Sequence, residues 1–98
     1  MMPKVIVHKM ADGAKFIEWW CPGCKQRHAI RVPGWTWNEN EESPTFNPSV
    51  GVNLGRPNPE AHVCHTYVRE GQIQFLTDCS HDLAGQTVPL PSIPEEFL

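Results

Sequence analysis

The chain contains 98 residues, a length that predicts a single domain spanning 1–98. A formal net charge of −3 and 40% hydrophobic residues exclude a disordered or fibrous protein. We expect a cytoplasmic protein, because the chain shows neither a signal-peptide core nor the ~20 apolar residues of a membrane span.

The charges are unevenly distributed along the chain. Residues 1–35 carry six Lys or Arg and two Asp or Glu, whereas residues 36–98 carry two and nine. A strong basic surface is the usual mark of a nucleic-acid-binding domain. The chain as a whole lacks that surface, so nucleic acid is the least favoured partner, and a local basic patch within residues 1–35 stays open.

Short strands separated by turns are predicted along the first half. Residues 4–10 and 14–20 form a hairpin around Asp12-Gly13, which is a strong turn signal. Further strands are predicted at 28–32, 35–37 and 50–54, with an acidic, Pro-punctuated loop at 38–49.

A second hairpin is predicted in the later part of the chain. Its strands, 61–69 and 72–79, flank Glu70-Gly71. A single helical turn follows, starting at Ser80 and stopping at Gly85, and the tail 88–94 is predicted to be extended and to pack as an irregular strap. The elements predict a small, mainly β domain resembling a zinc ribbon, with two or more antiparallel hairpins and one short helical turn.

The four cysteines predict a single zinc site. Cys21 and Cys24 form a Cys-x-x-Cys half-site without the βαβ context of a redox pair. If residues 70–71 are a two-residue turn, Cys64 and Cys79 are diagonal neighbours on one face of the late hairpin. Four thiolates would form a closed, structural zinc site. In the alternatives, one of His65, His81 or His28 replaces a thiolate, or the late cysteines are simply small buried residues.

Other polar residues gather around the late hairpin, and a His oriented by an Asp could perform hydrolysis there. We interpret them instead as groups that support the metal loop, and we name no catalytic residue. These residues are His62, His65, Asp78, His81 and Asp82.

Trp35 and Trp37 share one face if residues 35–37 form a strand. Core packing, contact with a protein partner and stacking on single-stranded nucleic acid are all open for this pair. We assign Trp35 and Trp37 to the surface that binds an unidentified protein partner.

Four segments together resemble a family of small, mostly uncharacterised phage and bacterial proteins, often labelled ammonia monooxygenase. The segments are 20–24, 43–50, 64–71 and 78–87. The resemblance implies zinc binding by Cys21, Cys24, Cys64 and Cys79, with His65 and His81 beside the metal. It also implies proximity to bacterial ubiquitin-like conjugation genes, which fits an adaptor role. The monooxygenase label does not fit this chain, because such an enzyme is a membrane copper protein.

From these observations we expect a zinc-stabilised accessory module, phage-encoded or bacterial, that binds another protein. The first alternative is a zinc-dependent hydrolase with an open metal site, in which Asp78 or Asp82 acts as base or orienter. The second is a nucleic-acid-binding zinc module.

Overall fold

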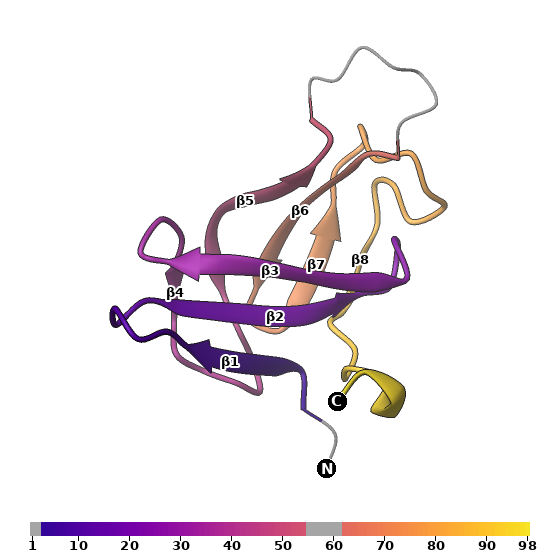
Figure 1. Cartoon of the computed structure of the whole chain (residues 1–98). Helices are drawn as coiled ribbons and strands as arrows, with labels where there is room; N and C mark the ends of the chain where they lie inside the picture. The colour runs from indigo at the N-terminus through magenta and orange to yellow at the C-terminus, as the bar shows by residue number, and fades with distance from the viewer. Residues whose placement is uncertain (1–2, 55–61) are drawn as a thin grey trace.

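The computed structural model describes residues 3–54 and 62–98. Within these residues the chain forms two antiparallel sheets, one with the strand order β1-β2-β3 and the other with the order β4-β5-β6-β7-β8 (Figure 1). The strands are β1 (Val5–Lys9), β2 (Lys15–Cys21), β3 (Gln26–Val32), β4 (Thr36–Trp37), β5 (Phe46–Val52), β6 (Cys64–Arg69), β7 (Gln72–Phe75) and β8 (Thr87–Pro89).

The first sheet is built from the hairpin predicted around Asp12-Gly13. The Ala14 amide donates a hydrogen bond to the Asp12 carboxylate over 2.9 Å, and Gly13 has a φ of 90°. A side chain that bonds the backbone two residues on is a common way to stabilise a turn. The tight loop after β2 then leads directly into β3.

The second sheet is built around the late hairpin. Arg69 pairs with Gln72, so residues 70–71 form the predicted two-residue turn. Pairing between β6 and β7 ends at Thr66 and Phe75, and the chain then turns away from the sheet. The turn therefore fixes the register, although the second strand is shorter than expected.

The two sheets enclose one hydrophobic core. In Figure 1 the strands of the first sheet run across those of the second. Trp19 of β2 stacks on Phe46 of β5 with ring centroids 4.8 Å apart, and both side chains are fully buried. This aromatic contact packs the first sheet against the second and so fixes the position of side chains on one sheet relative to those on the other.

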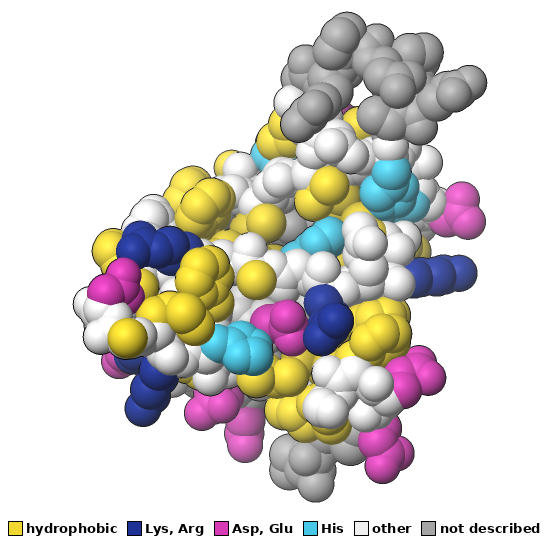
Figure 2. All heavy atoms as spheres, viewed as in Figure 1, with side chains coloured by type: hydrophobic (Ala, Val, Ile, Leu, Met, Phe, Trp, Pro, Cys, Tyr) yellow, Lys and Arg dark blue, Asp and Glu magenta, His cyan; other side chains and the backbone are white. Residues whose placement is uncertain are grey.

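The outer surface mixes charges of both signs. Figure 2 shows Lys and Arg side chains beside Asp and Glu side chains on one face of the molecule. On the first sheet, Glu18 lies 3.6 Å from Arg27 and 3.8 Å from His8. Such exposed pairs contribute little to stability.

The mainly β fold is confirmed, and two local predictions are wrong. The predicted loop 38–49 contains the start of β5 at Phe46, because Pro48 is accommodated in an irregular strand. The segment after Ser80 forms turns rather than a helix. The tail is extended as predicted at its start, where β8 pairs with β7, and its side chains Leu90 and Ile93 are buried. The described residues include one helical element, the 3-10 turn Glu95–Phe97, and no helix long and apolar enough to cross a membrane. Residue 61 of the predicted strand 61–69 lies outside the described residues.

Candidate active site and thiol cluster

Ser49 lies in an irregular stretch of β5. Phe46 pairs with Val68 and Val50 with Thr66, so three residues of β5 lie opposite one residue of β6. Such a bulge bends the strand and redirects its side chains. The Ser49 hydroxyl oxygen consequently lies 3.0 Å from Nε2 of His65 on β6.

Asp78 is the third side chain in a series connected by hydrogen bonds through His65. It lies in the turn that follows β7, where the Leu76 amide donates to the His65 carbonyl over 2.9 Å. One Asp78 carboxylate oxygen lies 3.1 Å from Nδ1 of His65. The two ring nitrogens of one histidine are thus joined to a serine and to an aspartate.

The chemistry of the partners determines the protonation of the ring. An ionised carboxylate only accepts hydrogen bonds, so Nδ1–H donates to Asp78. In the neutral ring Nε2 is then the acceptor, and the Ser49 hydroxyl donates to it. This is the tautomer in which a histidine can remove the proton from a serine.

The arrangement is accessible from outside. The side chains of His65 and Asp78 are 22% and 53% exposed. A hollow of about 460 Å³ opens beside them and includes Gln74, Thr77 and Gly85 in its lining. The hollow therefore gives a bound molecule access to His65 and Asp78, whereas Ser49 is half-buried beside the histidine and is not one of the residues that line it.

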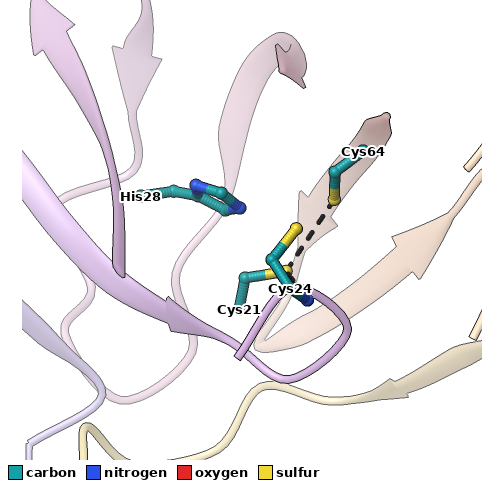
Figure 3. A group of neighbouring side chains, drawn as sticks. All are labelled: Cys21, Cys24, His28 and Cys64. Atoms are coloured by element: carbon teal, nitrogen blue, oxygen red, sulfur yellow. Dashed lines mark hydrogen bonds between the residues drawn. The ribbon is translucent and has the colours of Figure 1, made fainter. Parts of the chain in front are cut away.

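A second feature, the thiol cluster, joins the two sheets. Figure 3 shows Cys21 of β2, His28 of β3 and Cys24 of the loop between them gathered near Cys64 of β6. Their ligand atoms all lie within 4.8 Å of one another, and the sulfurs of Cys21 and Cys64 are 3.8 Å apart. Tetrahedral zinc with Zn–S bonds of about 2.3 Å places two sulfurs about 3.8 Å apart. The spacing therefore fits two ligands of one zinc ion.

Cys79 and His81 extend the cluster on the other side of Cys64, and the ligand atoms of these three residues also lie within 4.8 Å of one another. In the described part of the chain, Nε2 of His28 and Nε2 of His81 are buried without a hydrogen-bond partner. Buried polar nitrogens are rarely left unsatisfied, so both are available to a metal.

The local sequence explains why the first half-site is so compact. The Cys24 amide donates to the Cys21 sulfur over 3.4 Å, and the Lys25 amide donates to the Cys21 carbonyl over 2.8 Å. A Cβ atom on Gly23 would lie 2.3 Å from the His81 ring. Only glycine allows this loop to approach His81 so closely.

The clustered thiols share negative charge. Hydrogen bonds from Cys24 and Cys64 hold the pKa of Cys21 far below its ordinary value. The hydrogen bond to Cys21 raises the pKa of Cys24 to about 12, and the same interaction strongly raises the pKa of Cys64. A lowered pKa at Cys21 favours the thiolate form that binds a thiophilic cation.

The residues predicted from the sequence fall into two groups. Cys21, Cys24 and Cys64 come together, and Cys79 lies beside Cys64 in the second group; His28 and His81 lie close enough to these groups to serve as ligands. His65, proposed as an alternative ligand, belongs to neither group of potential ligands, because both its ring nitrogens face Ser49 and Asp78.

The tryptophans predicted to bind a partner are both partly buried against the core. Nε1 of Trp35 donates to the backbone carbonyl of Ser49 over 3.3 Å. The role of Trp35 and Trp37 in binding another protein stays a prediction.

A serine joined through a histidine to an aspartate is the arrangement of serine hydrolases, and it is recognised by geometry rather than by chain order. Comparison with protein families gives a more specific result. Residues 1–76 match the family described as "Bacterial ubiquitination-like system serine protease (BubE)", and the chain belongs to this family. The match includes Ser49 and His65 and ends two residues before Asp78. No curated protein and no solved structure matches the chain.

The family corrects the functional expectation. A non-enzymatic accessory module is wrong, because the family is described as a protease. The description names a serine protease, which also differs from the zinc-dependent hydrolase and the nucleic-acid module held as alternatives. Sequence reasoning named His65 and Asp78 only among five polar residues of the late hairpin that support the metal loop, and it missed Ser49, whose position depends on the bulge in β5.

Proposed function

We propose that the protein is a serine peptidase of a bacterial ubiquitination-like system, with Ser49 as nucleophile, His65 as general base and Asp78 as the residue that orients it. The observation that carries this proposal is the pair of contacts made by the His65 ring. Nε2 lies 3.0 Å from the Ser49 hydroxyl and Nδ1 lies 3.1 Å from Asp78. Both distances are within the range required for proton transfer and orientation.

The reaction follows from these positions. His65 Nε2 removes the hydroxyl proton while the Ser49 oxygen attacks the substrate carbonyl carbon, which gives a tetrahedral oxyanion. When that intermediate collapses, the bond to the leaving nitrogen breaks, and His65 returns the proton to the departing amine. A water molecule, deprotonated by the same nitrogen, then hydrolyses the acyl-enzyme and restores Ser49.

The direct test is covalent labelling of Ser49 by a fluorophosphonate. The serine oxygen displaces fluoride from phosphorus, and mass spectrometry locates the adduct. We expect one adduct at Ser49 in the wild-type protein and none in Ser49→Ala or His65→Ala. Ser92→Ala is a control for general serine reactivity and should label like the wild type. Labelling of another serine, or equal labelling of Ser49 in His65→Ala, would contradict the proposal.

We further propose that the thiol cluster binds one structural zinc ion. The spacing of the Cys21 and Cys64 sulfurs and the unpartnered nitrogens of His28 and His81 support this assignment. Cys21 and Cys64 are 0% and 1% exposed, so a metal there would stabilise the contact between the two sheets. The zinc ion takes no part in the proposed reaction, which uses the side chains of Ser49, His65 and Asp78.

The zinc proposal is tested by metal analysis and X-ray absorption on protein purified without chelator. We expect one zinc per chain with three or four sulfur ligands at about 2.3 Å, any fourth ligand being a histidine nitrogen. A metal-free protein with the same thermal stability would contradict this assignment, whatever the outcome of the labelling experiment.

A further inference from the structure

Cys79 bonds the backbone of the proposed catalytic histidine. Its sulfur accepts a hydrogen bond from the His65 amide over 3.2 Å and donates to the His65 carbonyl over 3.4 Å. The side chain is only 8% exposed. One buried sulfur thus contacts both polar backbone groups of residue 65.

The position of Cys79 follows from the end of the sheet. Backbone pairing between β6 and β7 stops at Thr66 and Phe75, one residue short of His65. The turn after β7 then places a side-chain sulfur, rather than a backbone carbonyl, at the His65 amide. The His65 carbonyl also accepts from the Leu76 amide over 2.9 Å, and residue 65 pairs with Gly51 of β5. The sulfur therefore supplies the hydrogen bond of the His65 amide, and it is a weaker acceptor than the carbonyl oxygen that a continued ladder would provide.

The same turn carries the other partner of the histidine. Asp78, which immediately precedes Cys79, holds Nδ1 of His65. The Cys79 amide donates to the Leu76 carbonyl over 3.2 Å, which closes the turn. Movement of Cys79 would therefore shift the histidine backbone and its orienting carboxylate together.

We propose that Cys79 is a positioning residue for His65 that keeps the ring aligned between Ser49 and Asp78. This inference rests on the proposed triad. The Cys79 sulfur also lies within 4.8 Å of the ligand atoms of Cys64 and His81, so one side chain belongs to both the thiol cluster and the support of the active site. If Cys79 binds a metal as a thiolate, it still accepts from the His65 amide and no longer donates to the carbonyl.

The adjacent residue provides a matched control. Ser80 makes the equivalent contacts with Val63: its hydroxyl accepts from the Val63 amide over 2.8 Å and donates to the carbonyl over 3.3 Å. Ser80→Ala loosens the same two segments without touching residue 65. Cys24→Ala removes a sulfur of the thiol cluster that does not contact His65, and so measures the effect of losing a potential metal ligand.

The experiment uses the full-length protein and two readouts. The first is the rate of fluorophosphonate labelling at Ser49. The second is the tautomer of the His65 ring, read from its ¹⁵N chemical shifts, which does not require the protein to be active. In Cys79→Ala we expect labelling to slow by about 10- to 100-fold, because small displacements of catalytic groups carry costs of this size. The Nδ1–H tautomer should give way to a mixture.

The variants make the interpretation specific. We expect Ser80→Ala to label within about threefold of the wild type and to retain the Nδ1–H tautomer. Cys24→Ala should label at least threefold faster than Cys79→Ala. Cys79→Ser keeps a donor and an acceptor, so its labelling rate should lie between those of Cys79→Ala and the wild type. If Cys79→Ala does not fold, Cys79→Ser replaces it in the comparison.

Three results would overturn the inference. The first is an unchanged tautomer and labelling rate in Cys79→Ala, or in Cys79→Ser if that variant replaces it. The second and third are a decrease in labelling rate in Ser80→Ala, or in Cys24→Ala, that equals the decrease in Cys79→Ala. A wild-type protein that does not label at Ser49, while its His65 tautomer still depends on Cys79, would refute the peptidase proposal and support the positioning role. The two proposals can therefore fail separately.

Discussion

Replacement of Asp78 by Asn tests the electrostatic part of the proposed triad with little change in shape. The wild-type carboxylate accepts from Nδ1 of His65 over 3.1 Å. The Asn amide group can donate instead, which favours the ring tautomer protonated on Nε2. That tautomer cannot accept the proton of Ser49.

The exposure of the pair sets the expected magnitude. In a buried triad the same substitution lowers the rate by about 10⁴-fold. Here the Asp78 side chain is 53% exposed, so water can replace part of the lost interaction. A charge-assisted hydrogen bond contributes about 1.5–3 kcal/mol, which corresponds to a decrease of about 10- to 150-fold in rate.

The assay is the rate constant of fluorophosphonate labelling at Ser49 near neutral pH. Asp82→Asn is the matched control, since it makes the same change in charge on an exposed residue four positions further along the chain. We expect the control to label at the wild-type rate. Equal rates for Asp78→Asn and the wild type would refute the role of Asp78, and equal slowing in Asp82→Asn would attribute the effect to net charge.

Three further changes test the surroundings of the two sites. A zinc chelator should lower the midpoint of thermal unfolding of the purified protein by calorimetry, and no shift would contradict a structural metal. Gly23→Ala places a Cβ 2.3 Å from the His81 ring, so we expect a loss of about 1–3 kcal/mol in the free energy of unfolding, measured with urea. Trp35→Phe removes the donor to the Ser49 carbonyl, and labelling should slow by about 2- to 10-fold, the equivalent of one neutral hydrogen bond. A wild-type rate in Trp35→Phe would show that the indole does not position the nucleophile.

The parts of the structure that depend on local sequence were predictable. Glu70-Gly71 is a two-residue turn, so it fixed the pairing of Arg69 with Gln72 and the register of both strands. Cys21 and Cys24 are three positions apart, and their convergence needs only one tight loop. The cluster of cysteines could therefore be inferred without knowledge of the whole fold.

The position of Ser49 could not be predicted in this way. Its contact with His65 spans 16 positions and depends on a bulge that places three residues of β5 opposite one of β6. A regular ladder through the same segment would pair different residues and direct their side chains elsewhere. A serine after Pro48 also has no distinctive local signature. Sequence reasoning listed the histidine and the aspartate among polar residues that support the metal loop, and it left out the nucleophile for this reason.

The alternation of a β-strand explains how so small a protein can hold both sites. On β6, Cys64 faces the thiol cluster, His65 faces Ser49, and Thr66 is buried in the core. The turn after β7 also contributes one residue to each site: Asp78 bonds Nδ1 of His65, and the sulfur of Cys79 lies near that of Cys64. A metal bound to the cluster would therefore act on hydrolysis through the backbone it fixes, rather than by contact with the substrate carbonyl. Substitutions at positions 64 and 79 should consequently lower stability and labelling rate together, whereas Ser49→Ala should abolish labelling while stability is retained.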